Sequence, residues 1–301
     1  MNTLIVGCGY LGTALGEELA RRGHTVWGMR RSADGDAVLT GAGIRPVHAD
    51  VTRPGWSGVL PEPVHWVVYC AAPASGDPAG YAAVYGAGVR RVVEELLGHP
   101  VRRAVYTSST GVYAEARGGW VTEESATAAF EEKGQWLLAA ERTWLEAAQS
   151  AAWRPVVLRV SGMYGAGRGY YIRRFFEGPG LGPEEADRWI NQVHRDDVVT
   201  AVICALEHAE PGAVYNVTDD EPVQLGRLFA WLEERTGRPA PAGGAPGEVR
   251  RRPGSGNKRV SNARIKTELG WRPRYPTFRE GYEAELIRLK RTRPVPSDEH
   301  T

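Results

Sequence analysis

The feature that most constrains the fold is a glycine-rich turn near the start of the chain, where residues 7–12 read Gly-Cys-Gly-Tyr-Leu-Gly. A short apolar run precedes it, and behind it apolar side chains recur at the spacing of one helical face. A strand, a glycine turn and a helix in this order can bind a phosphate, because the helix N-terminus offers oriented N–H groups to an anion. The first glycine permits the tight turn, the second the approach of a pyrophosphate, and the third close packing of helix on strand. We therefore predict a dinucleotide site that includes Gly7, Gly9, Tyr10, Leu11 and Gly12.

Apolar runs and amphipathic stretches continue to alternate over the first 160 residues. Strands are expected at residues 4–6, 25–29, 47–50, 65–70, 104–108 and 156–160, and longer helices at about 81–97 and 134–149. Strands that alternate with helices of this length indicate a parallel sheet covered on both faces. The expected fold class is α/β, with a Rossmann-type doubly wound parallel sheet.

Beyond residue 160 the alternation becomes less regular. Residues 162–189 are rich in glycine and aromatic side chains, residues 214–217 read as a strand, and helices are expected at 196–207, 225–236, 263–269 and 278–291. Residues 237–258 are a proline- and glycine-rich loop. We predict a nucleotide-binding domain of residues 1–161 plus 190–212. A smaller substrate lobe would comprise 162–189 plus 213–292, followed by a tail of residues 293–301.

The end of the second expected strand bears on the choice of dinucleotide. An acidic residue there accepts hydrogen bonds from the ribose hydroxyls of NAD, whereas arginine pairs with the 2′-phosphate of NADP. The position is Arg30, followed by Arg31 and Ser32, and no carboxylate precedes Asp34. Two guanidiniums and a hydroxyl are well suited to a phosphate. NADP is therefore favoured, with NAD as the alternative; a solvated arginine pair is the competing interpretation.

Three further segments resemble motifs of one enzyme superfamily. Residues 106–113 (YTSSTGVY) resemble its S-S-x-x-V-Y motif, residues 158–168 its R-x-x-x-x-Y-G-P-G segment, and residues 193–198 its H-V-D-D segment. With the glycine turn, these motifs make the chain resemble the extended, NAD-dependent epimerase/dehydratase branch of the short-chain dehydrogenase/reductase superfamily. The resemblance implies that Ser109 takes the place of the catalytic Ser/Thr. It also implies further cofactor contacts at Asp50, Val51, Ala71, Ala72, Pro73 and Val160.

The chain departs from this family where the family usually carries Y-x-x-x-K. There the tyrosine exchanges a proton with the substrate oxygen, and the lysine lowers the phenol pKa from about 10. No tyrosine of this chain is followed by lysine four positions later. Alignment on Ala140-Glu141 puts Lys133 at the tyrosine position and Leu137 at the lysine position, and Tyr85 replaces the usual asparagine. The chain therefore resembles atypical members that lack the usual proton-transfer pair.

Other side chains could take over the chemistry. Tyr164 could present a phenol near the nicotinamide or pack beneath the lobe, and Lys133 could be an acid or an exposed helix-terminal residue. Tyr113 is expected to be structural, and His194 to hold a loop against the nucleotide domain, with the following two aspartates capping a helix. Cys8 is either a low-pKa thiol or a small filler beside the glycine turn.

Composition limits the class of protein. The chain has 37 Lys+Arg against 36 Asp+Glu, so no net field would attract nucleic acid or an anionic membrane. No apolar run approaches the roughly 18 residues of a membrane span, the N-terminus does not read as a secretion signal, and the three cysteines fit no zinc motif, so no metal is expected. A G-x-S-x-G hydrolase elbow is absent. A cytoplasmic protein is expected.

Two functions follow from these observations. The first is an NADP(H)-dependent reductase of a small hydroxy or carbonyl compound, in which Ser109 binds the substrate oxygen and Tyr164 or Lys133 supplies the proton. Such an enzyme would bind a small-molecule substrate, which could be sugar-derived, and the resemblance leaves a homodimer open. The second is a catalytically silent NADP(H) sensor that regulates a partner, a hypothesis motivated by the missing Tyr-Lys pair.

Overall fold

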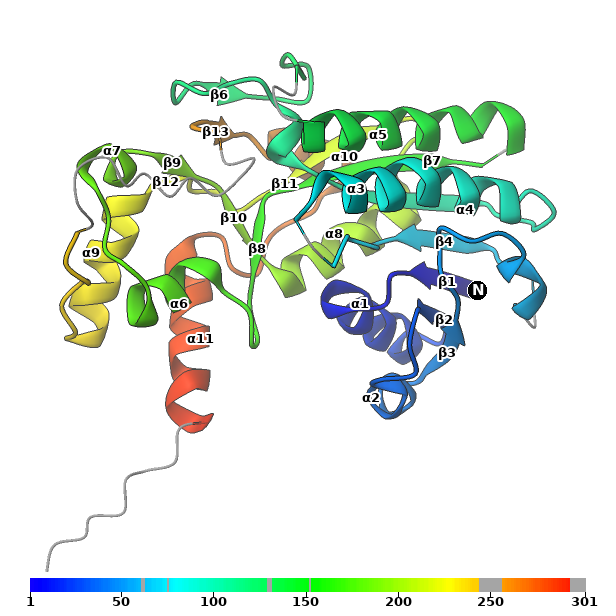
Figure 1. The fold of residues 1–301 in the computed structure, drawn as a ribbon, viewed down its shortest axis with the longest axis horizontal. Helices are drawn as coiled ribbons and strands as arrows, with labels where there is room; N and C mark the ends of the chain where they lie inside the picture. Colours follow the sequence, from blue (N-terminus) through cyan, green and yellow to red (C-terminus); the bar gives the residue numbers. More distant parts are fainter. Residues whose placement is uncertain (61–62, 75, 129–131, 152, 244–255, 293–301) are drawn as a thin grey trace, which may run out of the picture.

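The computed structural model describes residues 1–60, 63–74, 76–128, 132–151, 153–243 and 256–292. A seven-stranded parallel sheet with the strand order β11-β7-β5-β4-β1-β2-β3 forms the centre of the molecule (Figure 1). Its strands are β1 (Asn2–Val6), β2 (Thr25–Arg30), β3 (Ile44–His48), β4 (Trp66–Tyr69), β5 (Arg103–Ser109), β7 (Pro155–Val160) and β11 (Val214–Val217). From β1, the chain adds β2 and β3 on one side of the sheet and then β4, β5, β7 and β11 on the other side. A crevice for a ligand forms where the strand order reverses in this way, between β1 and β4. The predicted doubly wound α/β fold is confirmed.

Each face of the sheet has its own apolar core. Successive side chains of a strand point to opposite faces, so Ile5 joins one core cluster while Leu4 and Val6 join the other. The first cluster is covered by α1 (Tyr10–Arg21) and α8 (Arg195–His208), which pack on each other. The second is covered by α4 (Val89–Glu95) and α5 (Glu132–Ala151). The two layers hold the carboxyl ends of the strands at one common edge.

A C-terminal lobe adds a smaller aromatic core beside this edge. Three pairs of short strands build it or tie it to the sheet domain: β8 with β10, β9 with β12, and β6 with β13. The short strands are β6 (Trp120–Val121), β8 (Gly162–Tyr164), β9 (Trp189–Ile190), β10 (Gln192–His194), β12 (Val223–Gln224) and β13 (Arg259–Val260). The helices of this half are α6 (Tyr170–Glu177), α7 (Pro183–Ala186), α9 (Leu225–Thr236), α10 (Ala263–Leu269) and α11 (Phe278–Thr292).

The structure differs from the sequence-based expectation in three places. β11 pairs in parallel with β7 in the main sheet, although residues from 213 onward were assigned to the lobe. The helix expected at 81–97 is divided into α3 (Pro78–Tyr81), a π-helical segment η2 (Ala82–Gly88) and α4. The two- and three-residue strands were not predicted, because they are too short to show a period. The remaining elements are α2 (Asp36–Gly41), η1 (Trp56–Val59) and η3 (Thr110–Val112).

The predicted tail, residues 293–301, and most of the expected loop at 237–258 lie outside the described residues. In the part of the chain that the structure does describe, no helix combines the length and the apolar character required to cross a bilayer.

Candidate nucleotide and substrate site

A cavity of about 1100 Å³ runs along the carboxyl ends of the sheet strands and continues to the lobe. Its walls come from the glycine turn after β1, the ends of β2, β4, β5 and β7, the start of α5, and the segments around β8, β9 and β13. Every predicted cofactor residue lines it except Gly12. Of the three predicted catalytic residues, Ser109 and Lys133 line it and Tyr164 does not.

The glycine turn has the geometry that a phosphate loop needs. Gly7 has φ +84°, and a Cβ there would collide with the backbone of Ala71 after β4. A Cβ on Gly12 would lie 2.9 Å from the carbonyl oxygen of Gly7, so this glycine serves helix packing rather than the cavity wall. Gly9 has only open space where its Cβ would be. The turn is therefore closed against the protein and open towards the cavity.

The N-terminus of α1 is suited to an anion. Gly9 is its N-cap residue; no side chain among the described residues caps the helix, and its first turn carries no acidic residue. The first N–H groups of a helix have no partner within it and carry partial positive charge. The guanidiniums of Arg168 and Arg195 both lie over the ring of Tyr10, at 5.2 and 5.1 Å from its centroid. Burial raises the pKa of Tyr10 to about 12, although Arg195 acts against this. These features fit a dinucleotide.

Arg30, Arg31 and Ser32 line the cavity where β2 ends. The Ser32 hydroxyl contacts Asp34 Oδ2 at 3.2 Å. Asp50, after β3, lines the same region and accepts hydrogen bonds from the backbone N–H and the hydroxyl of Thr52, at 2.9 and 2.7 Å. These two bonds hold the pKa of the Asp50 carboxyl below its usual range. The end of the sheet at β2 thus combines two guanidiniums with one fixed carboxylate.

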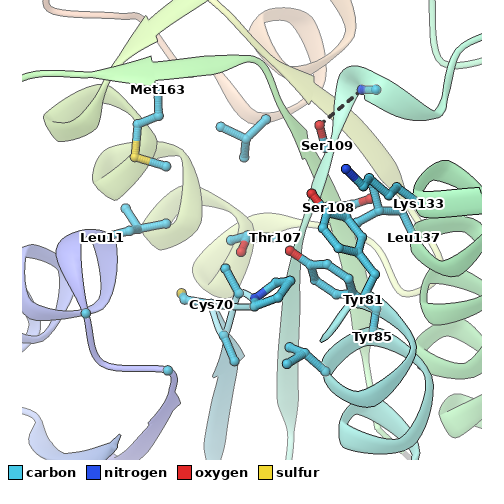
Figure 2. Close-up of a pocket in the computed structure, with 18 of the residues that line it drawn as sticks. Leu11, Cys70, Tyr81, Tyr85, Thr107, Ser108, Ser109, Lys133, Leu137 and Met163 are labelled. Carbon is cyan, nitrogen blue, oxygen red and sulfur yellow. Dashed lines mark hydrogen bonds between the residues drawn. The ribbon is translucent and has the colours of Figure 1, made fainter. Parts of the chain in front are cut away.

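At the opposite part of the cavity, the side chains of Ser109 and Lys133 approach each other (Figure 2). Ser109 ends β5, and its hydroxyl oxygen accepts a hydrogen bond of 3.1 Å from the backbone N–H of Gly111. Lys133 extends from the first turn of α5, with its Nζ 5.7 Å from the ring centroid of Tyr81. Leu137, one turn further along α5, presents an apolar side chain to the same space. The arrangement offers one hydroxyl and one ammonium to a polar substrate atom.

Two phenols that the sequence analysis did not propose as functional also line this part of the cavity. Tyr81 and Tyr85 lie with their rings 5.3 Å apart, edge to face, beside Ser109 and Lys133 (Figure 2). Burial raises the pKa of Tyr85. Tyr85 belongs to the π-helical segment η2, and such segments often occur at functional sites. The sequence signal was that Tyr85 stands where the family usually has asparagine, but a π-helical turn cannot be read from periodicity.

The expectation that Tyr164 supplies a proton is not supported by its position. Tyr164 is 2% exposed, stacks on Tyr282 with centroids 4.6 Å apart, and packs against Gly281. Its hydroxyl has no hydrogen-bond partner among the described residues, and burial raises its pKa strongly. Met163, the preceding residue of β8, lines the cavity instead. Because neighbouring side chains of a strand point to opposite faces, Tyr164 is directed into the lobe core.

Tyr113 has a structural environment, as expected. It borders the cavity, but its hydroxyl donates to Asn216 Oδ1 at 2.7 Å and accepts from Arg159 Nη1 at 3.1 Å. Arg159 forms a buried ion pair with Glu141, which also accepts a 2.6 Å hydrogen bond from the Ser108 hydroxyl. This buried network connects β5, α5, β7 and β11 behind the cavity wall. Burial raises the pKa of Tyr113, partly offset by Arg159.

His194 is the N-cap residue of α8, and its Nδ1 accepts the N–H of Asp196 at 3.2 Å. The prediction that the two following aspartates cap this helix is therefore wrong. Asp197 instead accepts the backbone N–H groups of Arg274 and Tyr275, at 2.6 and 3.0 Å, and so holds the segment before α11. Cys8 is fully buried, and this burial raises its pKa to about 11. That environment matches a filler rather than a reactive thiol.

Comparison with known proteins agrees with this geometry. The model of the NAD-dependent epimerase/dehydratase family matches residues 3–218. The chain belongs to this family. Relatives of this family member include the protein YeeZ of Escherichia coli strain K12, 28% identical over 278 residues, which cover 90% of this chain and 95% of YeeZ. A 3-diazoavenalumate denitrifying reductase of a Streptomyces species is 27% identical over 309 residues, covering 95% of this chain and all of the reductase.

A solved structure from Methylobacillus flagellatus, described as an NAD-dependent epimerase/dehydratase, is 34% identical to this family member. The superposition has a TM-score of 0.76 and covers 96% of this chain and 98% of the other. The likeness therefore extends through the lobe beyond residue 218. Nicotinamide-dinucleotide binding and oxidoreductase or epimerase chemistry are the general properties of the family to which this chain belongs.

Proposed function

We propose that this protein is an NADP(H)-dependent reductase of a small carbonyl compound. The observation that carries the proposal is the set Arg30, Arg31 and Ser32 on the cavity wall at the end of β2. A 2′-phosphate at this position would receive charge-assisted and bidentate hydrogen bonds, which two adjacent guanidiniums are suited to make. The reductase from Streptomyces, similar over its whole length, supports reduction as the class of reaction.

The glycine turn would hold the pyrophosphate. Gly9 leaves open the space that a side chain would fill, and the uncapped N-terminus of α1 supplies N–H donors. Asp50 and Val51 would border the adenine, and Ala71, Ala72 and Pro73 the turn beside the dinucleotide. Val160, at the end of β7, would lie near the nicotinamide, which when bound supplies hydride.

The residues of the chain itself would bind the substrate oxygen and supply its proton. Ser109 already accepts one hydrogen bond from Gly111, which leaves its O–H free to donate to a carbonyl oxygen. The ammonium of Lys133 lies near Ser109 and would donate the proton to the substrate oxygen. Leu137 occupies the position at which other family members have lysine, so Lys133 is the cation that this site offers instead.

The test of the cofactor assignment is calorimetric titration of the protein with NADP⁺ and with NAD⁺. We expect NADP⁺ to bind at least ~10-fold more tightly, a difference of about 1.4 kcal/mol. Equal affinity, or a preference for NAD⁺, would contradict the proposal.

The test of the reaction is NADPH oxidation, followed by absorbance, with a panel of aldehydes and ketones. Turnover that is lost in Ser109→Ala supports the reductase. Tight NADP(H) binding without turnover on any member would favour the alternative, a silent sensor, for which the apolar Leu137 at the usual lysine position is the supporting observation.

A further inference from the structure

Lys258 is a buried lysine on the cavity wall at the lobe end. The residue as a whole is only 4% exposed to solvent. Desolvation of a lysine is costly, so buried lysines are usually paired with an acidic group. Within the described ranges, no side chain forms a hydrogen bond or an ion pair with its Nζ. Among the described residues, the ammonium of Lys258 therefore has no hydrogen-bonded acidic partner at the edge of the cavity.

Burial lowers the pKa of Lys258, and the charge of Glu115 acts in the opposite direction. Glu115 forms no ion pair with Lys258, and its Oε1 already accepts the backbone N–H groups of Arg117 and Gly119, at 2.6 and 3.2 Å. These two bonds hold the pKa of Glu115 below its usual range. Glu115 therefore stays ionised and acts on the ammonium through its charge, but it forms no hydrogen bond with Lys258.

The backbone on both sides of Lys258 is firmly held. Asn191 uses both ends of its amide: Nδ2 donates to the carbonyl oxygen of Lys258 at 2.9 Å, and Oδ1 accepts from the N–H of Val260 at 2.8 Å. Asn257 accepts the N–H groups of Gly118 and Trp189, at 2.8 and 3.0 Å. The ammonium therefore extends from a firmly held backbone position directly before β13.

The neighbouring residue, Arg259, strengthens the same support. Its guanidinium lies between the rings of Trp120 and Trp189, at 5.2 and 5.0 Å from their centroids, and donates to the carbonyl oxygen of Gly118 at 2.8 Å. On the other side, a Cβ at Gly256 would lie 2.9 Å from Nζ of Lys258. The absence of a side chain at Gly256 therefore leaves room for the ammonium of Lys258. Preorganised groups of this kind are typical of binding sites.

We propose that Lys258 binds an anionic oxygen group of the substrate, either a carboxylate or a phosphate monoester. The proposal rests on the proposed function, because it assigns a substrate class to the same cavity. The substrate would carry its carbonyl at Ser109 and Lys133 and its anionic group at the lobe end. An anion there would supply the hydrogen-bonded charge partner that the described residues do not provide.

The experiment uses three probes with one phenyl ring and different head groups: benzoate, phenyl phosphate and benzamide. Each is titrated calorimetrically into the full-length protein, with and without NADP⁺. We expect at least one anion to bind wild type about 10-fold more tightly than benzamide, as a charge-assisted hydrogen bond would give. The stronger of the two anions identifies the head group.

The variant Lys258→Met should reduce this preference to within about twofold. The matched control is Lys266→Met, which removes an ammonium from α10 that pairs with Asp220 outside the cavity; this variant should keep the preference. Wild type that does not prefer either anion, or Lys258→Met that retains the preference, would overturn the proposal. If Lys258→Met fails to fold, Lys258→Gln also removes the charge and is read in the same way.

Thermal unfolding gives a second readout. If Lys258 is kept for ligand binding, replacing it with an apolar side chain of similar length should leave Tm unchanged or raise it, because a buried unpaired charge is removed. A large fall in Tm together with intact anion binding would make Lys258 a structural residue. NADP⁺ affinity is measured separately, so its absence refutes the proposed function without deciding the role of Lys258.

Discussion

Glu141 of α5 and Arg159 of β7 form a buried ion pair in which Oε2 lies 2.8 Å from Nη2. Both side chains are less than one-tenth exposed. The pair connects the helix that carries Lys133 to the strand whose last residue pairs with Ser109. It therefore fixes the relative positions of the two groups proposed to contact the substrate.

Removing one partner of this pair should strongly destabilise the fold. Glu141→Ala leaves the guanidinium of Arg159 buried without its carboxylate, and we expect a loss of about 3–5 kcal/mol in the free energy of unfolding. Urea denaturation measures it. The control is Glu94→Ala, which breaks the exposed pair with Arg91 on α4 and should cost less than about 1 kcal/mol. Equal losses in the two variants would contradict the importance given to the buried pair.

The arginines at the end of β2 should determine the choice of cofactor. The double variant Arg30→Ala/Arg31→Ala is expected to weaken NADP⁺ binding by about 10- to 100-fold while changing NAD⁺ binding by less than about threefold. Calorimetry with both dinucleotides measures the two affinities.

A matched control removes another adjacent pair of guanidiniums. Arg21→Ala/Arg22→Ala acts at the far end of α1, where both arginines bind Glu18. It should leave the NADP⁺ affinity unchanged. A parallel loss of NAD⁺ and NADP⁺ affinity in the Arg30/Arg31 variant would show that these side chains do not read the 2′-phosphate.

Ser109 and Tyr164 should differ sharply in their effect on turnover. Ser109→Ala should slow NADPH oxidation by about 10²–10⁴-fold, because it removes a donor to the substrate oxygen. Tyr164→Phe should leave the rate within about twofold and the stability within about 1 kcal/mol, since the lost hydroxyl is buried without a partner among the described residues. Steady-state kinetics on the two variants compares them, and a large rate loss in Tyr164→Phe would restore that phenol as a proton donor.

Asp219 should make the stability depend on pH. Burial of this residue, 2% exposed, raises the pKa of its carboxyl well above the usual range, and Asp220 adds to the effect. In the unfolded chain the carboxyl group titrates at about 3.9. The folded state therefore holds the proton more tightly, and this stabilisation is complete below the unfolded pKa and is lost as pH rises through the folded pKa.

Asparagine does not titrate, so the variant Asp219→Asn should not lose stability at this position as pH rises. The variant should gain stability relative to wild type between about pH 5 and about pH 8, by on the order of 1 kcal/mol or more. Urea denaturation at both pH values measures the difference. Glu94→Gln, at an exposed position paired with Arg91, is the control and should show no such gain. A difference between Asp219→Asn and wild type that does not change with pH would contradict the assignment.

Much of the fold could be predicted because its signals are local. The run before Gly7, the glycines of the turn and the apolar period behind it lie within twenty residues, so strand, turn and helix were readable directly. The long strands and helices followed in the same way, and the resemblance of the motif around Ser109 pointed to its place on the cavity wall. Here local pattern and tertiary position agree.

The site was predicted less completely because several of its contacts join distant segments. Lys258 reaches the cavity only because β13 pairs with β6, which brings residues 259–260 beside 120–121. A two-residue strand carries no period, and a lysine in an arginine-rich stretch reads as solvated. Tyr85 reaches the cavity from a π-helical segment, whose extra residue per turn leaves no apolar period in the sequence.

The sequence by itself determined the α/β class, the glycine turn and the absence of the usual Tyr-x-x-x-Lys pair, because each depends on residues close together in the chain. Only the tertiary structure decided that Tyr164 is buried in the lobe while Met163 lines the cavity, and that Lys258 lies there without a hydrogen-bonded acidic partner in the described residues. The physical reason is that a side chain's environment depends on which face of its strand it occupies and on what packs against that face.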